Sequence, residues 1–272
     1  MKKTVLITGA SSGIGKATAK EFAAKDWNVI ATMRDPSKEK DLTQINNIFV
    51  VRLDVEQPNT IQEAIEAGIR KFEKIDVLIN NAGQGLFGIF EATPQESIQH
   101  LFEINVFGTM SVTRAILPHF RKQKRGMIVN ITSSTGRFTI PLLSVYSASK
   151  YALEGFSESL SFELSSQNIK IKLIEPGMVA TNFDNATRDS YTANENQAAY
   201  NDYFEKMIKL FSEEDTVKVT AEEAADIIYN AVTDDTDTLR YAIGADVKAM
   251  VATRNSMTDQ EYMDMMRKQF SV

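Results

Sequence analysis

Residues 8–15, which read TGASSGIG, decide the fold of this 272-residue chain. They follow a short aliphatic run, Thr4–Thr8, and lead into a helical pattern over Gly15–Lys25. Glycines at a strand-to-helix turn let the backbone approach a ligand closely, and the N-terminus of the helix offers free N–H groups to a phosphate. The turn therefore predicts a binding site for a phosphate-bearing ligand.

Other interpretations of the same turn stay open. A G-x-S-x-G elbow would make Ser11 a hydrolase nucleophile, but such an elbow follows several earlier strands, and this one follows the first. Its histidine would have to be His100 or His119, which lie in one predicted helix. A phosphate-binding loop of the nucleoside triphosphatase type would lack its first glycine, at Ala10, and its magnesium-binding hydroxyl, at Ala17. A glycine turn that binds nothing is the remaining alternative.

Short apolar runs alternate with longer helical patterns beyond this turn. The runs are Thr4–Thr8, Val29–Thr32, Ile48–Leu53, Val77–Asn80, Met127–Thr132 and Ile169–Ile174. The helical patterns are Gly15–Lys25, Thr60–Phe72, Gln95–Lys122 and Ser144–Ser165. Nearly continuous apolar runs suit strands covered on both faces, and strand–helix alternation implies right-handed parallel crossovers. The sequence thus predicts an α/β fold, a single doubly wound parallel sheet of the Rossmann type with helices on both faces.

No linker divides the chain, so residues 1–272 are expected to form a single domain. Residues 1–181 are the expected cofactor-binding and catalytic core. Residues 182–218 are polar and aromatic without strand signals, and they are expected to form a helical substrate lid. Residues 219–272 are expected to supply C-terminal helices and a last strand: a helix opening at Thr220, a strand over Leu239–Ile243 and a Met-rich helix over 258–270.

Composition removes several classes of function. The chain has 30 Lys and Arg against 36 Asp and Glu, a net charge of −6, which argues against nucleic-acid binding. It has no Cys and only two His, so no thiol nucleophile is available and no metal site is expected. No apolar run approaches the ~18 residues of a membrane span, and the start, MKKTVLITGA, lacks the apolar stretch of a signal peptide. We therefore expect a cytoplasmic protein without a membrane partner.

The end of the second predicted strand bears on the choice of cofactor. An acidic residue there would accept hydrogen bonds from an adenosine ribose 2′-hydroxyl. This chain has Met33 at that point, followed by Arg34, whose guanidinium would pair with a 2′-phosphate. Asp35 is the opposing signal, because it could pair with Arg34 instead. The pattern favours NADP over NAD.

Tyr146 and Lys150 form the predicted catalytic group together with Ser133. The two are four residues apart and share one face of the helix that opens at Ser144. An ammonium near a phenol favours the phenolate, so we expect Lys150 to lower the pKa of Tyr146 toward the range of a general acid or base. Ser133 lies thirteen residues earlier, just past a predicted strand, where a hydroxyl would reach a carbonyl oxygen.

At these residues the chain resembles the short-chain dehydrogenases/reductases, in their short single-domain branch. Seven motifs carry the resemblance over residues 4–181, in order and at the right spacing. They are TGASSGIG (8–15), LDV (53–55), NNAG (80–83), FEINVFG (102–108), NITSSTG (130–136), YSASK (146–150) and PGMVAT (176–181). Ser12 stands where some NADP-binding members carry a basic residue, which leaves Arg34 as the clear candidate for the 2′-phosphate.

The resemblance implies roles residue by residue. Ser133, Tyr146 and Lys150 match the catalytic trio, with Lys150 also binding the nicotinamide ribose. Asn105 matches the asparagine that holds a water of the proton relay. The diphosphate turn would be lined by Gly9, Ser11, Ser12, Gly13, Ile14 and Gly15, the adenine by Asp54 and Val55, the adenosine half by Asn81, Ala82 and Gly83, and the carboxamide end by Pro176, Gly177, Val179 and Thr181.

The resemblance also implies reversible hydride transfer between NADP, with NAD possible, and a carbonyl or secondary alcohol. Aromatic residues in the lid, together with Phe87 and Phe90, suit a bulky apolar substrate, although packing of the lid on the core would explain them as well. A non-catalytic NADP-binding sensor or scaffold on the same fold is the alternative function. A homodimer or homotetramer is expected, because relatives usually associate through the segment 95–122.

Overall fold

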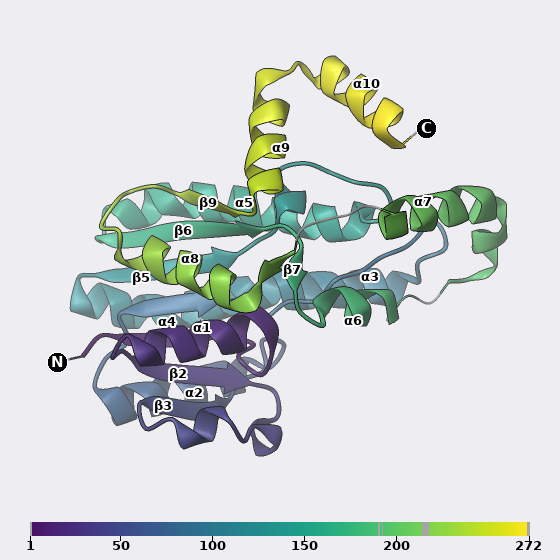
Figure 1. Cartoon of the computed structure of the whole chain (residues 1–272). Coiled ribbons are helices and arrows are strands. Elements are labelled where there is room, and N and C mark those ends of the chain that lie inside the picture. Colours follow the sequence, from purple (N-terminus) through teal and green to yellow (C-terminus); the bar gives the residue numbers. More distant parts are fainter. Residues whose placement is uncertain (1, 190, 192, 214–217, 271–272) are drawn as a thin grey trace.

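A seven-stranded parallel sheet forms the centre of the computed structural model, which describes residues 2–189, 191, 193–213 and 218–270 (Figure 1). The strand order is β3-β2-β1-β4-β5-β6-β9, and all six pairs of neighbours are parallel. The strands are β1 (Thr4–Ile7), β2 (Asn28–Met33), β3 (Ile48–Arg52), β4 (Val77–Asn80), β5 (Gly126–Ile131), β6 (Ile169–Pro176) and β9 (Arg240–Ile243). The expected doubly wound Rossmann-type sheet is confirmed.

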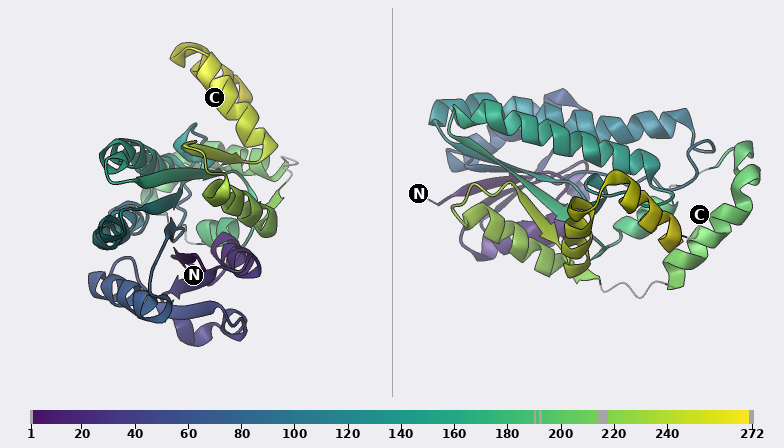
Figure 2. Two further views of the ribbon diagram at one scale, coloured as in Figure 1. Left: turned by 90° about the vertical axis from the view of Figure 1, so that its left-hand side faces the viewer. Right: turned by 90° about the horizontal axis from the view of Figure 1, so that it is seen from above.

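Helices cover both faces of this sheet (Figure 2). One face packs against α1 (Gly13–Ala24) and α8 (Ala221–Thr233), and the other against α2 (Pro58–Phe72), α4 (Thr109–Gln123) and α5 (Ser144–Ser165). The central strands are buried on both sides, which explains why their sequences read as continuous apolar runs rather than alternating ones. The loops at the carboxyl ends of these strands are where functional groups are expected.

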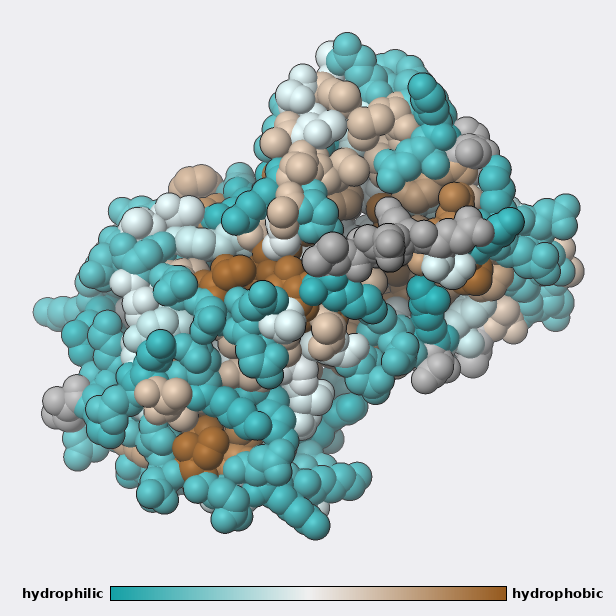
Figure 3. All heavy atoms as spheres, in the orientation of Figure 1, coloured by the Kyte–Doolittle hydropathy of each residue, from teal (hydrophilic) through white to brown (hydrophobic). Residues whose placement is uncertain are grey.

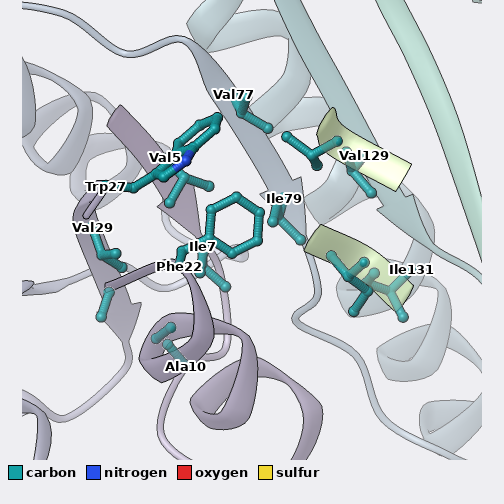
Figure 4. Close-up of a cluster of buried hydrophobic side chains, with 14 of the residues drawn as sticks. Val5, Ile7, Ala10, Phe22, Trp27, Val29, Val77, Ile79, Val129 and Ile131 are labelled. Atoms are coloured by element: carbon teal, nitrogen blue, oxygen red, sulfur yellow. The ribbon is translucent and has the colours of Figure 1, made fainter. Parts of the chain in front are cut away.

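The core beneath α1 is centred on Phe22 and Trp27 (Figure 4). Their rings meet edge to face with centroids 5.1 Å apart, and Phe22 is fully buried. Burial of a side chain of this size contributes roughly 2–3 kcal/mol. This packing fixes α1 on the sheet and with it the glycine turn at the start of the helix.

The segment predicted as one helix over Gln95–Lys122 is interrupted. It consists of α3 (Gln95–Phe102), a π-helical turn η3 (Glu103–Gly108) and α4. A π-turn accommodates one extra residue within a helix and is frequent at functional sites. Here it carries Asn105, whose carbonyl oxygen accepts a hydrogen bond from Thr109 Oγ1 at 2.9 Å.

The rest of the chain is mostly helical. The lid contains α6 (Phe183–Asp189), η5 (Glu195–Tyr200) and α7 (Asn201–Glu213), and the C-terminal part adds α9 (Ala245–Ser256) and α10 (Asp259–Phe270). A small parallel pair, β7 (Val179–Ala180) with β8 (Val219–Thr220), was not predicted. Short helical turns complete the description: η1 (Pro36–Lys38), η2 (Leu42–Gln44) and η4 (Ser134–Gly136). The helix predicted to open at Thr220 is α8, and Thr220 caps it in a capping box with Glu223.

Candidate active site

The glycine turn is locked against the loop that follows β4. Asn81 Nδ2 donates to the carbonyl oxygens of Thr8 and Gly9 at 2.9 and 3.0 Å. Gly9 has φ +66°, and a Cβ there would lie 2.9 Å from the Cα of Ala82. At Gly15 a Cβ would lie 2.4 Å from Asn81 Nδ2. Only glycine fits these two positions, so the turn and the NNAG loop form one rigid cradle.

The N-terminus of α1 opens into this cradle. Its N-cap residue is Ser12, whose side chain makes no capping hydrogen bond, and Ser11 and Ser12 are both exposed. Gly13 has φ +51°, and a Cβ on it would meet Thr181 Cγ2 at 3.3 Å. Ile14 packs against the core beneath. Uncapped N–H groups beside a glycine cradle fit the diphosphate of a dinucleotide.

Arg34 lies exposed directly after β2, at the edge expected for the adenosine ribose. Asp35 accepts hydrogen bonds from Ser37 and pairs with Lys38 at 3.2 Å, so it does not hold Arg34. On the other expected wall, Asp54 N donates to Thr60 Oγ1 at 3.0 Å, which fixes the turn after β3. These contacts leave the guanidinium available to an anion.

The predicted catalytic residues converge at the carboxyl ends of the strands. Asn105, Ser133, Tyr146 and Lys150 are each at most 8 % exposed. Lys150 Nζ lies 5.7 Å from the centroid of the Tyr146 ring and donates to the carbonyl oxygen of Ile131 at 3.1 Å. A Cβ on Gly83 would contact both Asn105 Oδ1, at 3.3 Å, and Lys150 Nζ, at 3.8 Å. The sequence-predicted residues are thus brought together.

Asn105 is held by the backbone of Gln84. Its Oδ1 accepts from Gln84 N, and its Nδ2 donates to Gln84 O, both at 2.9 Å. The amide also donates to Ser149 Oγ at 3.2 Å. The π-turn therefore fastens the NNAG loop to the helix that carries Tyr146 and Lys150.

The expected lowering of the Tyr146 pKa is wrong for the protein alone. Burial raises the pKa of Tyr146 to about 12, a hydrogen bond with Ser133 pulls it down, and Asp184 of the lid pushes it up. Burial also lowers the pKa of Lys150 to about 8, against the attraction of Glu154. Desolvation is the largest cause of both shifts because both side chains are buried.

The expected carboxamide end lies where β6 leaves the sheet. Gly177 N donates to Ile243 O at 3.1 Å, and a Cβ on Gly177 would lie 2.4 Å from Val247 Cγ2. Pro176 and Val179 are buried, and Thr181 meets the glycine turn at Gly13. The expected carboxamide and diphosphate parts of the cofactor site therefore lie next to each other. This contact also links the start of the lid to the turn.

The segment expected to form the lid contacts Tyr146 through Phe183. The Phe183 ring lies 6.1 Å from the Tyr146 ring, centroid to centroid. Farther along, a Cβ on Gly85 would lie 2.1 Å from Thr187 Oγ1, and one on Gly88, at φ +141°, would lie 1.9 Å from Tyr191 Cε2. Sequence analysis missed both glycines, whose signal was their place just after the NNAG motif.

The described residues also form an open apolar groove of about 420 Å³. Its walls come from the loop after β4, the turn before α5 and the lid: Gly88, Ile89, Phe90, Glu91, Leu142, Ser144, Tyr200 and Tyr203. Leu142 holds an unusual φ of +65°, and its carbonyl oxygen accepts from Gly88 N at 2.8 Å. In Figure 3 the visible face is largely hydrophilic, with hydrophobic residues gathered where the C-terminal helices rise from the sheet.

Two other features of the described residues bear on chemistry. No His, Asp and Glu side chains within the described ranges gather into a group able to hold a metal ion. Within those same ranges, every helix is too short or too polar to cross a bilayer.

His119 accepts a hydrogen bond from Ile75 N at 3.0 Å, and burial lowers the pKa of its imidazole, so His119 serves the packing of α4. His100 lies 3.1 Å from Glu56 near the surface.

Comparisons with known proteins place the chain in a family. A model described as short chain dehydrogenase matches residues 3–192. An uncharacterised oxidoreductase of Schizosaccharomyces pombe is 37 % identical over 240 residues, covering 88 % of this chain and 100 % of that one. A 3-ketodihydrosphingosine reductase of Bacteroides thetaiotaomicron is 37 % identical over 211 residues, covering 78 % and 76 %. The chain belongs to the short-chain dehydrogenases/reductases, oxidoreductases that act on CH–OH and C=O groups.

Solved structures of similar fold also match the chain. A short-chain dehydrogenase from Streptomyces avermitilis matches with a TM-score of 0.83 and 31 % identity, covering 100 % of this chain and 98 % of that one. A structure of ElxO with NADP bound matches with a TM-score of 0.73 and 31 % identity, covering 89 % and 97 %. The likeness to the first of these extends over the lid and the C-terminal helices as well as the sheet.

Proposed function

We propose that this protein is an NADP-dependent carbonyl reductase and alcohol dehydrogenase acting through Tyr146. The convergence of Asn105, Ser133, Tyr146 and Lys150 beside an uncapped helix N-terminus carries this proposal. A sensor or scaffold, the alternative function, has no use for a buried tyrosine and lysine on one helix face, since burying both costs stability.

Each residue of this group has a distinct task. The cofactor, when bound, supplies or accepts the hydride at the nicotinamide. Tyr146 donates its phenolic proton to the carbonyl oxygen during reduction, and its high pKa keeps that proton in place until charge develops on the oxygen. Ser133 holds the same oxygen. Lys150 and Asn105 return a proton to Tyr146 through water.

NADP is the proposed cofactor, with NAD possible. The cradle at Gly9 and Gly15 would be filled by a Cβ, and the free N–H groups of α1 face it, which fits a diphosphate. Arg34 supplies the preference, because it is exposed next to the ribose edge and Asp35 is engaged elsewhere. ElxO, which is similar in fold, has been solved with NADP bound.

We propose a bulky apolar carbonyl or alcohol as substrate, covered by the lid 182–218. The apolar groove begins at Ser144, two residues from Tyr146, and offers room for a long substituent. The reductase of Bacteroides thetaiotaomicron is named for 3-ketodihydrosphingosine, and the same chemical class would suit this groove.

Turnover tests the proposal. Purified protein is mixed with NADPH, and separately NADH, and loss of absorbance of the reduced nicotinamide is followed over carbonyls from small aldehydes to long-chain and aryl ketones. Turnover by the wild type and its loss in Tyr146→Phe, with NADPH affinity retained, would support the proposal. Full activity of Tyr146→Phe would refute it, and NADPH binding without turnover on any carbonyl would favour the sensor.

A homo-oligomer is proposed as the assembly. Phe107 of η3 and Phe162 of α5 are 51 % and 73 % exposed, and Tyr151 of α5 is 42 % exposed. Large exposed aromatics on neighbouring helices are typical of a surface that is covered by a second subunit. Light scattering at micromolar concentration tests this, and Phe162→Glu should shift the mass toward a monomer.

A further inference from the structure

A partly buried cluster of charged residues lies next to the catalytic group, on the side of α5 facing β6. Arg137 Nη1 pairs with Glu175 Oε1 at 2.7 Å. Arg240 Nε pairs with Glu154 Oε2 at 2.9 Å and lies 3.5 Å from Glu175 Oε1, and Arg240 also pairs with Glu158. The two inner carboxylates are nearly inaccessible, with Glu154 5 % and Glu175 1 % exposed.

Stability alone gives little reason for such a cluster. Removing two carboxylates from water costs several kcal/mol per group, and buried ion pairs are often replaceable by apolar residues without loss. Burial raises the pKa of Glu175 despite the attached Arg137, which shows how unfavourable the site is for charge. The position of the cluster in the fold offers a better reason.

Three members of the cluster, Arg137, Glu154 and Glu175, lie close in the chain to predicted site residues. Arg137 ends the turn η4, which begins after Ser133. Glu175 directly precedes Pro176, and Glu154 is one helical turn after Lys150. A Cβ on Gly136 would lie 3.1 Å from Glu154 Cγ and 3.2 Å from Lys150 O, so η4 and α5 are in contact there. The cluster therefore ties together the three elements that carry the site.

One carboxylate oxygen of the cluster is left without a partner. Glu154 Oε1 has no hydrogen-bond partner within the described part of the chain, whereas the outer carboxylate, Glu158, is half exposed to water. Lys150 is the buried cation one turn away. The contacts of Lys150 within the described residues are uncharged: the Tyr146 ring, the Asn105 amide, Gly83 and the carbonyl of Ile131. The negative charge of Glu154 opposes the lowering of the Lys150 pKa by burial.

We propose that Glu154, fixed by the Arg137–Glu175–Arg240 cluster, is a positioning residue of the active site, whose charge one helical turn away keeps Lys150 an ammonium. An ammonium is the form that binds ribose hydroxyls and passes a proton toward Tyr146. This consequence rests on the proposed function, whereas the charge of Lys150 can be measured without any cofactor.

The test is an NMR titration of Lys150 in cofactor-free protein labelled at lysine Cε, with Lys150→Arg identifying the signal. In the wild type the Lys150 ammonium should titrate with a pKa of about 8. Glu154→Gln keeps the shape of the side chain and removes its charge, so the midpoint should fall by about one pH unit. Glu158→Gln is the matched control, because it also loses a partner of Arg240 but lies a turn farther from Lys150, and its midpoint should stay in place.

Two further variants keep the proposal falsifiable if Glu154→Gln does not fold. Glu154→Asp should return the midpoint to near the wild-type value, and Arg137→Gln, which removes a cation, should raise it. An unchanged midpoint in Glu154→Gln, or an equal fall in Glu158→Gln, would overturn the proposal. Failure of the wild type to bind NADPH would instead refute the proposed function, while the titration would still decide the role of Glu154.

Discussion

Substitution of Arg34 by Ala should separate the two nicotinamide cofactors. Arg34 stands exposed at the end of β2, and the neighbouring Asp35 is held by Ser37 and Lys38. The guanidinium therefore needs to break no ion pair with Asp35 before it meets a 2′-phosphate. Its whole contribution should appear with NADPH and none with NADH, which lacks that phosphate.

The size of the effect follows from exposure. A hydrogen bond between charged groups is stronger than a neutral one, but water around an exposed pair screens it and reduces the gain to the lower end of the range. The loss of this hydrogen bond in Arg34→Ala corresponds to about a tenfold rise in KM for NADPH, while KM for NADH should stay within about twofold of the wild-type value. Raising the ionic strength should shrink the difference between wild type and Arg34→Ala.

The assay is initial-rate reduction of the best carbonyl with each cofactor in turn. Lys38→Gln is the matched control, because Lys38 is a neighbouring cation whose ammonium is paired with Asp35 at 3.2 Å. It should leave both KM values unchanged. Equal losses with NADPH and NADH in Arg34→Ala, or no loss with either, would refute the assignment of Arg34 to the 2′-phosphate.

Three other substitutions test the rest of the structure. Lys172 is 1 % exposed and pairs with Asp234, so Lys172→Met should lower the free energy of unfolding by about 2 kcal/mol at pH 7, measured by urea titration. Partial burial pushes the pKa of Asp234 up, but hydrogen bonds from Lys172 and Tyr241 hold the pKa of this carboxyl well below its usual range. The stabilisation by the Lys172–Asp234 pair is therefore present above pH ~4 and fades as the pH falls. A difference in unfolding free energy between wild type and Lys172→Met that is as large at pH 3 as at pH 7 would contradict this reasoning. Tyr203→Ala opens the groove wall and should raise KM about tenfold for long-chain ketones but not for short ones; equal changes for both would exclude the groove. Gly88→Ala places a Cβ against Tyr191 and should lower kcat/KM for bulky ketones at least about tenfold with NADPH affinity unchanged, whereas wild-type kinetics would show that the lid contact is dispensable.

Sequence patterns predicted the regular core because local signals and tertiary packing agree there. The predicted bounds of Val77–Asn80 and Ser144–Ser165 are those of β4 and α5. The break at η3 was not predicted, because the apolar spacing over residues 95–122 continues through Glu103–Gly108. It depends on Asn105 closing onto the backbone of Gln84, a contact across 21 residues.

The electrostatics of the site were harder to predict than its residues. Spacing places Lys150 beside Tyr146 but says nothing of how much water remains there, and burial determines the direction of both pKa shifts. Glu154 and Glu175 went unnoticed for a similar reason. Glu175 stands within a buried strand and Glu154 on the buried face of α5, and an acidic residue at such a position implies a partner that the sequence alone does not name.

The small pairing of β7 with β8 has a consequence for how this fold can change. Val179 and Ala180 lie in register with Val219 and Thr220, and Val219 N donates to Met178 O at 3.0 Å, so the chain leaves and re-enters the body at one place. Closing a loop costs little more when the loop is longer, so segments of other lengths can be accommodated between these two points. A segment transplanted from a relative between Thr181 and Val219 should bring its donor's substrate range with it, while the host keeps its own nicotinamide preference.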